Sequence, residues 1–415
     1  MSSSRSARTG RSGTSSSGKP TSLAPSIGQR IYLDYGGYAP VDPRVLAVMA
    51  TYLEGWVGNP SALHSLGEEA RESLEGTRAK VARLIGGRAE GVIFTSGATE
   101  ANNLAIKGVA LRAAERGRHL VTSAIEHISV LTPCRDLTKA GFGVSHLPVD
   151  REGRVNPEQL VRTLRPDTVL VSLGCANAEA GTVQPIRELA RVLRGRGVLL
   201  HVDGVGAVGR VPLHLEDDGI DLLTLSANDL YGPPGVGALY AAPGVKLLPQ
   251  LLGGGQEHGL RSGTENLAGI AGFGLAAELM RREGSAEVRR LGALREALIE
   301  GVLARCEGTA LTGPRTERLP HHASFTVQAV KGESLVMALD LAGIAASTGS
   351  ACASLTQEPS HVLRALGLDP RAVEGSLCFT LGRWSTREDV EGLLRELPQA
   401  VERLRAISPL ARARG

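Results

Sequence analysis

Lysine is scarce in this chain of 415 residues, because only six of its 46 basic residues are lysine and the other 40 are arginine. A mechanism that needs a reactive amine therefore has few candidates. Long hydrophobic runs are also missing, since no apolar stretch approaches the ~20 residues that span a bilayer. The five cysteines lack the spacing of a disulfide framework or a zinc site, which favours a reducing compartment. We expect a cytoplasmic protein with no membrane partner. The lysines are Lys19, Lys80, Lys107, Lys139, Lys246 and Lys331.

The composition is that of a globular protein, with 42% hydrophobic and 21% charged residues. The N-terminus differs, because the first 30 residues contain ten serines, five basic residues and no acid. We interpret residues 1–29 as a disordered arm, a solvated tail or a tether rather than an organelle transit peptide. Removing the +5 charge of the first 30 residues from the total of +3 leaves −2 for the rest, so we expect no nucleic-acid partner.

Short apolar runs alternate with helical segments between residues 90 and 245, which predicts an α/β fold with a mostly parallel sheet flanked by helices. Two of the predicted helices cover 99–116 and 186–194. Ligands of such sheets bind beyond the carboxyl ends of the strands. The predicted strands cover 92–95, 119–123, 168–173, 198–202, 221–225 and 237–241.

A smaller α+β domain is expected after a long helical stretch at about 264–305. We place the large domain at 30–285, with about 30–44 packing on the small domain, and the small domain at 286–408, before a tail at 409–415. The elements expected in the small domain are strands at 322–327 and 376–381 and helices at 333–341, 359–366 and 386–407.

Four segments carry candidate chemistry. Residues 95–100 run from a strand through a small-residue turn into a helix, which suits an anion but also an ordinary helix cap. Asp203 ends a very apolar strand, where it either faces a cationic partner or caps the next helix. Residues 226–237 form a Gly/Pro-rich turn that places polar side chains at the sheet edge. Residues 347–354 form a small-residue loop that presents one thiol, Cys352, for which a reactive role is plausible.

Together these segments resemble the cysteine desulfurases of the NifS/IscS type, which are class V aminotransferases with the fold-type I pyridoxal-phosphate architecture. The resemblance extends from about Ile31 to Val401. It implies the same fold, a pyridoxal phosphate cofactor, a homodimer, and an iron–sulfur scaffold or another sulfur acceptor as a partner. The matching residues are 33–35, 58–61, 95–100, 103–106, 126–127, 201–203, 253–257, 261–266, 349–352 and 358–365, with His64, Asn177, Glu179 and Gly181.

The resemblance also implies roles for single residues. Cys352 would take sulfur from a cysteine substrate as a persulfide, His127 would stack on the cofactor ring, and Asp203 would pair with the ring nitrogen. The remaining cofactor-binding residues would be Ala98, Thr99 and Ser226 at the phosphate, Thr264 reaching that phosphate from the second subunit, Asn177 at the ring oxygen, and Asn228 in the adjoining turn.

The departures from the family pattern concern the same site. Where the family has Ser-x-His-Lys, this chain has Asn228 and Asp229, and aspartate cannot form the Schiff base that the family's lysine forms. Gly206 stands where the family has a glutamine that contacts the cofactor. Cys378 stands where an arginine binds the substrate carboxylate. We therefore do not expect covalent cofactor binding.

Several hypotheses remain open. In the first, the protein acts in sulfur transfer or iron–sulfur assembly, with Cys352 and Asp229 as possible ligands of a metal or cluster. In the second, it is an enzyme that holds pyridoxal or pyridoxamine phosphate without a covalent bond and uses Asp229 or His127 as the base. In the third, it is an inactive structural or regulatory subunit, and in the fourth an ordinary desulfurase that converts cysteine to alanine.

Other polar residues have a structural interpretation. We expect Cys378 to be buried filler, the pair His321 and His322 to be exposed, and Asp229 to have a simple turn role as its alternative. The remaining residues that we expect to be structural are Cys134, Cys175, Cys306, His64, His146, His201 and His214.

Overall fold

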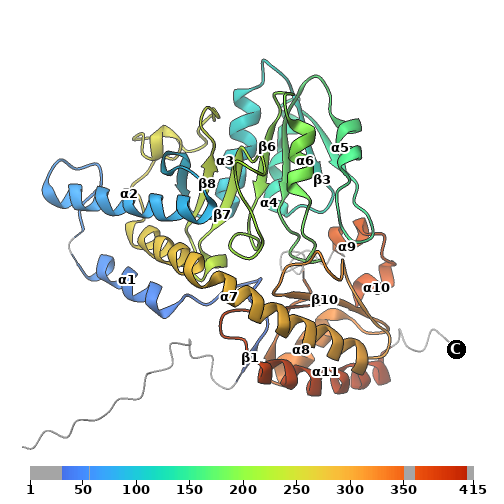
Figure 1. Ribbon diagram of the computed structural model, residues 1–415. Helices are drawn as coiled ribbons and strands as arrows, with labels where there is room; N and C mark the ends of the chain where they lie inside the picture. The colour runs from blue at the N-terminus through green and yellow to red at the C-terminus, as the bar shows by residue number, and fades with distance from the viewer. Residues whose placement is uncertain (1–29, 56, 350–359, 409–415) are drawn as a thin grey trace, which may run out of the picture.

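The computed structural model describes residues 30–55, 57–349 and 360–408. Its main feature is a seven-stranded sheet with the strand order β2-β8-β7-β6-β5-β3-β4 (Figure 1). Strand β8 is antiparallel to both of its neighbours, and the other pairs are parallel, which confirms the mostly parallel sheet. The strands are β2 (Val92–Thr95), β3 (His119–Ser123), β4 (Gly143–Leu147), β5 (Thr168–Gly174), β6 (Leu199–Asp203), β7 (Leu222–Ser226) and β8 (Gly237–Ala241).

Helices cover both faces of this sheet. Consecutive residues of a strand point to opposite faces, so neighbouring residues belong to different cores. Ile93 packs with α3 and α4 in one core, whereas the next residue, Phe94, packs with α2 and α7 in another. Continuous apolar strands are thus explained by two buried faces. The helices of this part are α1 (Pro43–Glu54), α2 (Ser65–Ile85), α3 (Ala98–Arg112), α4 (Ile128–Lys139), α5 (Pro157–Thr163), α6 (Ile186–Leu193) and α7 (Leu267–Arg305).

A second sheet, in the order β12-β10-β9, has its own core with the later half of α7 and with α8 and α11. Figure 1 shows α7 running from the helices beside the large sheet to this smaller sheet. Near the N-terminus, β1 (Ile31–Tyr32) pairs in parallel with β11 (Ile344–Ala345). The other elements are β9 (Thr309–Leu311), β10 (His322–Val327), β12 (Ser376–Thr380), α8 (Gly332–Leu341), α9 (His361–Ala365), α10 (Pro370–Glu374) and α11 (Arg387–Ile407).

The prediction that His321 and His322 are exposed is wrong, because they are only 5% and 1% exposed. His322 lies on β10 of the second sheet and hydrogen-bonds the carbonyl of Ala178, which follows β5 of the large sheet. This contact places His322 between the two sheets. Cys134, Cys175, Cys306 and Cys378 are buried as expected. No helix in the described part of the chain is long and apolar enough to cross a membrane.

Candidate functional site

Most of the residues singled out from the sequence gather at one edge of the large sheet. Strands β2, β3, β5, β6 and β7 all end there, because β8 is antiparallel to both β2 and β7. Ligands of α/β sheets bind at this edge. The residues that follow or end these strands are Ala98 and Thr99 after β2, His127 after β3, Asn177 after β5, Asp203 at the end of β6, and Ser226, Asn228 and Asp229 at and after the end of β7.

The first turn of α3 has the form of an anion cradle. Its N-cap residue is Gly97, which offers no side chain to the backbone N–H groups of that turn. Gly97 also lies against β8, where a Cβ atom on Gly237 would come within 2.7 Å of its Cα atom. Glu100 braces the turn by accepting a hydrogen bond from Ser96 N at 2.9 Å and pairing with Arg261 at 3.0 Å. The turn can therefore receive a phosphate group at the helix N-terminus.

Asp203 is a buried carboxyl group, 8% exposed, whose two oxygens accept separate hydrogen bonds. Oδ2 accepts from Asn102 Nδ2 at 2.8 Å and Oδ1 accepts from Val205 N at 3.0 Å. Burial raises the pKa of Asp203, while the hydrogen bonds and the nearby His127 oppose that rise. A cationic ring nitrogen placed beside this carboxyl group would stabilise its charged form.

His127 is an exposed residue that caps the N-terminus of α4. Its Nδ1 atom accepts a hydrogen bond from Ser129 N at 3.1 Å, and Ser129 Oγ lies 2.7 Å away from the same atom. The ring is thereby fixed beside Asp203 by a residue of its own helix. Neither Asn102 nor Ser129 was singled out from the sequence, although Asn102 adjoins the matched segment 103–106.

Asp229 lies in a short 3-10 turn, Asn228–Leu230, directly after β7, and it is partly buried. Burial raises the pKa of its carboxyl group, and repulsion from Asp203 acts in the same direction. The charge of Arg210 and a hydrogen bond with Ser226 lower that pKa. Arg210 also donates to the backbone carbonyl of Asp229 at 2.6 Å. Asp229 therefore lies in a turn and has Arg210 and Ser226 as its neighbours.

The two asparagines expected at the cofactor use their side chains largely within the protein. Asn228 donates to the carbonyl of Ala39 at 2.8 Å and accepts from Ala39 N at 3.3 Å, which holds the N-terminal segment to the turn. Asn177 donates to Ile125 O at 2.8 Å and its oxygen accepts from two backbone N–H groups of its own loop. One amide hydrogen of Asn177 remains for a ligand.

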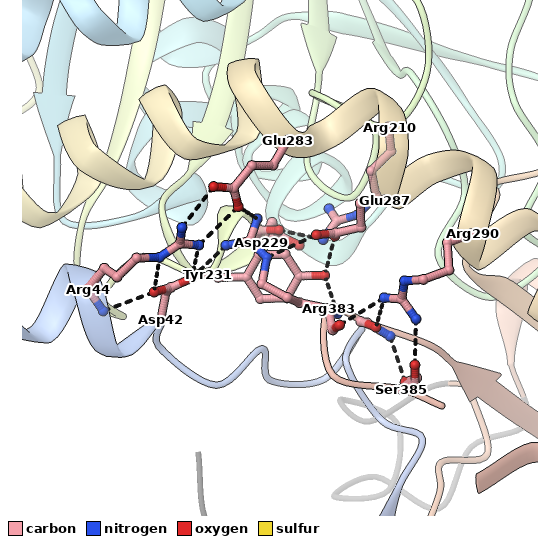
Figure 2. A network of polar contacts seen from close by, with 11 residues as sticks. Asp42, Arg44, Arg210, Asp229, Tyr231, Glu283, Glu287, Arg290, Arg383 and Ser385 are labelled. Atoms are coloured by element: carbon pink, nitrogen blue, oxygen red, sulfur yellow. Dashed lines mark hydrogen bonds and ion pairs between the residues drawn. The ribbon is translucent and has the colours of Figure 1, made fainter. Parts of the chain in front are cut away.

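A network of ion pairs lies beneath α7, next to Asp229 (Figure 2). Arg383 bonds Asp42 at 2.6 Å and Glu287 at 2.9 Å, and its guanidinium lies 4.4 Å from the centre of the Tyr231 ring. The Tyr231 hydroxyl donates to Glu287 at 2.6 Å. Tyr231 itself has a left-handed φ of 62°, a conformation that few residues with a Cβ atom adopt. The network ties the turn that carries Asp229 to α7 and to the chain after β12.

Cys378 is buried on β12, with its sulfur 3.2 Å from His322 Nε2. Burial raises the pKa of its thiol, and the nearby Asp34 and Glu179 raise it further, while Arg318 opposes them. At this position the resemblance expects an arginine that binds a carboxylate. A neutral thiol beside two acids offers a substrate carboxylate no positive charge in its place.

The residues of the edge fit part of the expected cofactor. The α3 turn suits the phosphate and Asp203 suits the ring nitrogen, but Asp229 has no amine for a covalent bond. Lys80, Lys107 and Lys139 pair with acids on the helices. Lys246 follows β8, whose carboxyl end lies at the opposite edge. Lys331 is exposed, directly before α8.

Two further expectations concern a metal and the thiol. Within the described ranges, no group of three or more His, Cys, Asp or Glu side chains could hold a metal ion. Cys352, expected to be the reactive thiol and a possible metal ligand, lies outside the described residues.

Two other residues concern the expected cofactor. Thr264, expected to reach the phosphate of a second subunit, is exposed. Gly206 has a φ of 75° with open space where its Cβ atom would be.

Comparisons with known proteins point to one family. The family model described as aminotransferase class-V matches residues 31–393. Cysteine desulfurase IscS 1 of Archaeoglobus fulgidus is 49% identical, over 92% of this chain and 99% of that protein, and cysteine desulfurase IscS of Dictyoglomus turgidum is 45% identical, over 92% and 97%.

Among solved structures, one described as a NifS-like protein has a TM-score of 0.85 at 35% identity and covers 91% of this chain and 100% of that one. DndA from Streptomyces lividans has a TM-score of 0.71 at 34% identity and covers 82% and 96%. The fold expected from the resemblance is therefore confirmed.

Proposed function

Because the chain belongs to the class V aminotransferases and, within them, to the IscS/NifS cysteine desulfurase family, we propose that it acts in sulfur transfer or iron–sulfur cluster assembly without covalently bound pyridoxal phosphate. The Cys352 thiolate attacks the outer sulfur of a donor persulfide and takes it over while the donor's thiolate leaves, or Cys352 ligates a cluster, and Asp229 provides a second ligand. The single observation behind this proposal is the partly buried carboxyl group of Asp229, directly after β7, where the resemblance expects the Schiff-base lysine.

The electrostatics of Asp229 support this assignment. Replacing an ammonium group by a carboxylate changes the local charge by two, next to the site that would hold an anionic phosphate. Burial raises the pKa of Asp229, and repulsion from the carboxyl group of Asp203 adds to that rise. A bound cation would relieve that repulsion. Carboxylate and thiolate are both reasonable ligands for iron.

The phosphate cradle and Asp203 are compatible with cofactor binding that is not covalent. Ala98, Thr99 and Ser226 would hold the phosphate, with Thr264 from a second copy of the chain, and Asp203 would face the ring nitrogen. When bound, the ring would supply an electron sink for carbanion chemistry. This second candidate function is an enzyme that uses Asp229 or His127 as its base, and failure of pyridoxal and pyridoxamine phosphate to bind in a titration would eliminate it.

Two simpler functions make different predictions. An inactive structural or regulatory subunit would work in cells equally well with Cys352→Ser and Asp229→Ala. An ordinary desulfurase, the activity named for the relatives, would release alanine from cysteine and would be inactivated by borohydride reduction of its cofactor imine. The proposed sulfur-transfer function predicts a defect for both variants and no borohydride-trapped cofactor. It also predicts a cytoplasmic homodimer that works with an iron–sulfur scaffold or another sulfur-acceptor protein.

The experiment that tests the proposal is anaerobic purification followed by iron and sulfide analysis and a visible spectrum, with and without added pyridoxal phosphate. We expect bound iron with sulfur-to-iron charge-transfer absorption, reduced in Cys352→Ser and in Asp229→Ala. Cys306→Ser is the matched control, because Cys306 is a buried core residue at the end of α7. Colourless, metal-free protein whose thiol is inert would contradict the proposal.

A further inference from the structure

A chain of short hydrogen bonds joins Asp203 to His127. Asn102 Nδ2 donates to Asp203 Oδ2 at 2.8 Å and to Ser129 Oγ at 2.8 Å. Ser129 Oγ lies 2.7 Å from His127 Nδ1. Asn102 is 0% exposed and Ser129 7%, so water does not compete for these bonds as it would at the surface. Two buried side chains from α3 and α4 therefore link the carboxyl group to the imidazole.

The hydrogens along this chain can be assigned. The Asn102 amide has two hydrogens, and the contacts to Asp203 and Ser129 use both. Ser129 Oγ thus accepts from Asn102, and its own hydrogen is free to point at His127 Nδ1. The backbone N–H of Ser129 donates to the same Nδ1 atom at 3.1 Å. A ring nitrogen that accepts hydrogen bonds carries no proton, so the neutral imidazole has its hydrogen on Nε2.

The amide orientation of Asn102 is set by its two neighbours. Asp203 Oδ2 and Ser129 Oγ both accept from Asn102 Nδ2, whereas the reversed orientation would place Asn102 Oδ1 against Asp203 Oδ2 and would turn the Ser129 hydroxyl away from His127. In the observed orientation, Asn102 Oδ1 is buried without a hydrogen-bond partner. An unpaired buried carbonyl oxygen has a free-energy cost, which the bonds that Asn102 Nδ2 makes to Asp203 and Ser129 offset.

We propose that Asn102 and Ser129 are positioning residues that hold His127 as the Nε2–H tautomer. His127 then presents a hydrogen-bond donor to a ligand and not a free base, which leaves Asp229 as the base in the second candidate function. The part that His127 plays toward a ligand rests on the function proposed above. The tautomer is a property of the protein alone, so it can be measured whether or not a cofactor, metal or cluster binds.

The test is nuclear magnetic resonance of the protein labelled with ring-¹⁵N histidine, at mildly alkaline pH, with the His127 signals assigned by their absence in His127→Gln. We expect the long-range ¹H–¹⁵N pattern of an Nε2–H imidazole. Ser129→Thr keeps the hydroxyl group and should keep that pattern. Ser129→Ala and Asn102→Ala each remove one bond of the chain but keep the backbone N–H of Ser129 that donates to Nδ1, so each should raise the fraction of the Nδ1–H tautomer in part.

His201 provides the internal control for folding, because it is held between Ser172 Oγ at 2.8 Å and Thr224 Oγ1 at 3.0 Å within the same sheet. Its signals should be unchanged in every variant. An Nδ1–H pattern for His127 in the unmodified protein would overturn the proposal, as would an unchanged pattern in Ser129→Ala and Asn102→Ala with normal His201 signals. Neither result depends on the outcome of the iron and cofactor measurements. The tautomer proposal can therefore be refuted while the proposed function stands, and the reverse also holds.

Discussion

Glu126→Gln should change how the stability of the protein depends on pH. Glu126 is 5% exposed and precedes His127 at the sheet edge. It accepts hydrogen bonds from Ser123 Oγ at 2.5 Å and Gly174 N at 2.7 Å. Burial raises its pKa from 4.5 to about 7, and the nearby Asp203 adds to the rise while the two hydrogen bonds oppose it. The folded protein therefore retains a proton that the unfolded chain loses at lower pH.

The sign and size of the effect follow from this difference. Between pH 4.5 and about 7 the unfolded state binds fewer protons at Glu126 than the folded state, so the stability from this group falls as the pH rises. Above pH 7 the loss is complete and constant. At about 1.4 kcal/mol for each pH unit, the loss amounts to roughly 3 kcal/mol. Glutamine has the same shape, carries no charge and cannot contribute this loss.

The assay is urea denaturation of the two proteins at a series of pH values. At each pH the unfolding free energy of the unmodified protein is subtracted from that of Glu126→Gln. This difference should rise by about 3 kcal/mol from acid to alkaline pH. Glu158→Gln is the control, because Glu158 is an exposed residue that pairs with Arg162 at 3.6 Å. Its difference from the unmodified protein should stay nearly flat. Parallel stability curves for Glu126→Gln and the unmodified protein would refute the reasoning.

Two further substitutions test the neighbourhood of Asp229. Arg383→Met leaves Glu287 buried without a cation, while Asp42 keeps its pair with Arg44, and it should cost about 3 kcal/mol of unfolding free energy in urea. Arg387→Met, which breaks an exposed pair, should cost less than about 0.5 kcal/mol. Equal effects of the two substitutions would contradict the assigned role of the network. Asp229→Lys should recover only a small part of the alanine release from cysteine that an ordinary desulfurase shows, because Cys378 still offers the substrate carboxylate no cation, and full recovery would show that Asp229 is the only barrier.

The sequence predicts the large sheet well because its strands are buried on both faces. In this sheet the predicted bounds of β2, β3 and β8 are the observed ones. Strand β4 was not predicted, since it lies at the sheet edge and carries Ser145 and His146, which an apolar pattern does not detect. The two-residue strands β1 and β11 are too short to show any periodicity.

The candidate site also contains residues that the sequence predicts and residues that it does not. Residues that end strands, such as Asp203 and Ser226, could be placed at one edge from the sequence, because parallel strands share their carboxyl edge. Asn102, Ser129 and Arg210 could not, because their importance depends on contacts between distant segments. The burial of His322 was missed for the same reason, since its partners Ala178 and Cys378 come from distant segments.

The central claim is that this member of the family works without a covalently attached cofactor, and the visible spectrum of the anaerobically purified protein tests it most directly. The account predicts absorption from iron–sulfur charge transfer, bound iron that depends on Cys352 and Asp229, and no imine band after pyridoxal phosphate is added. An imine band that borohydride converts to a stable pyridoxyl-lysine, found by mass spectrometry of the peptides, would contradict it.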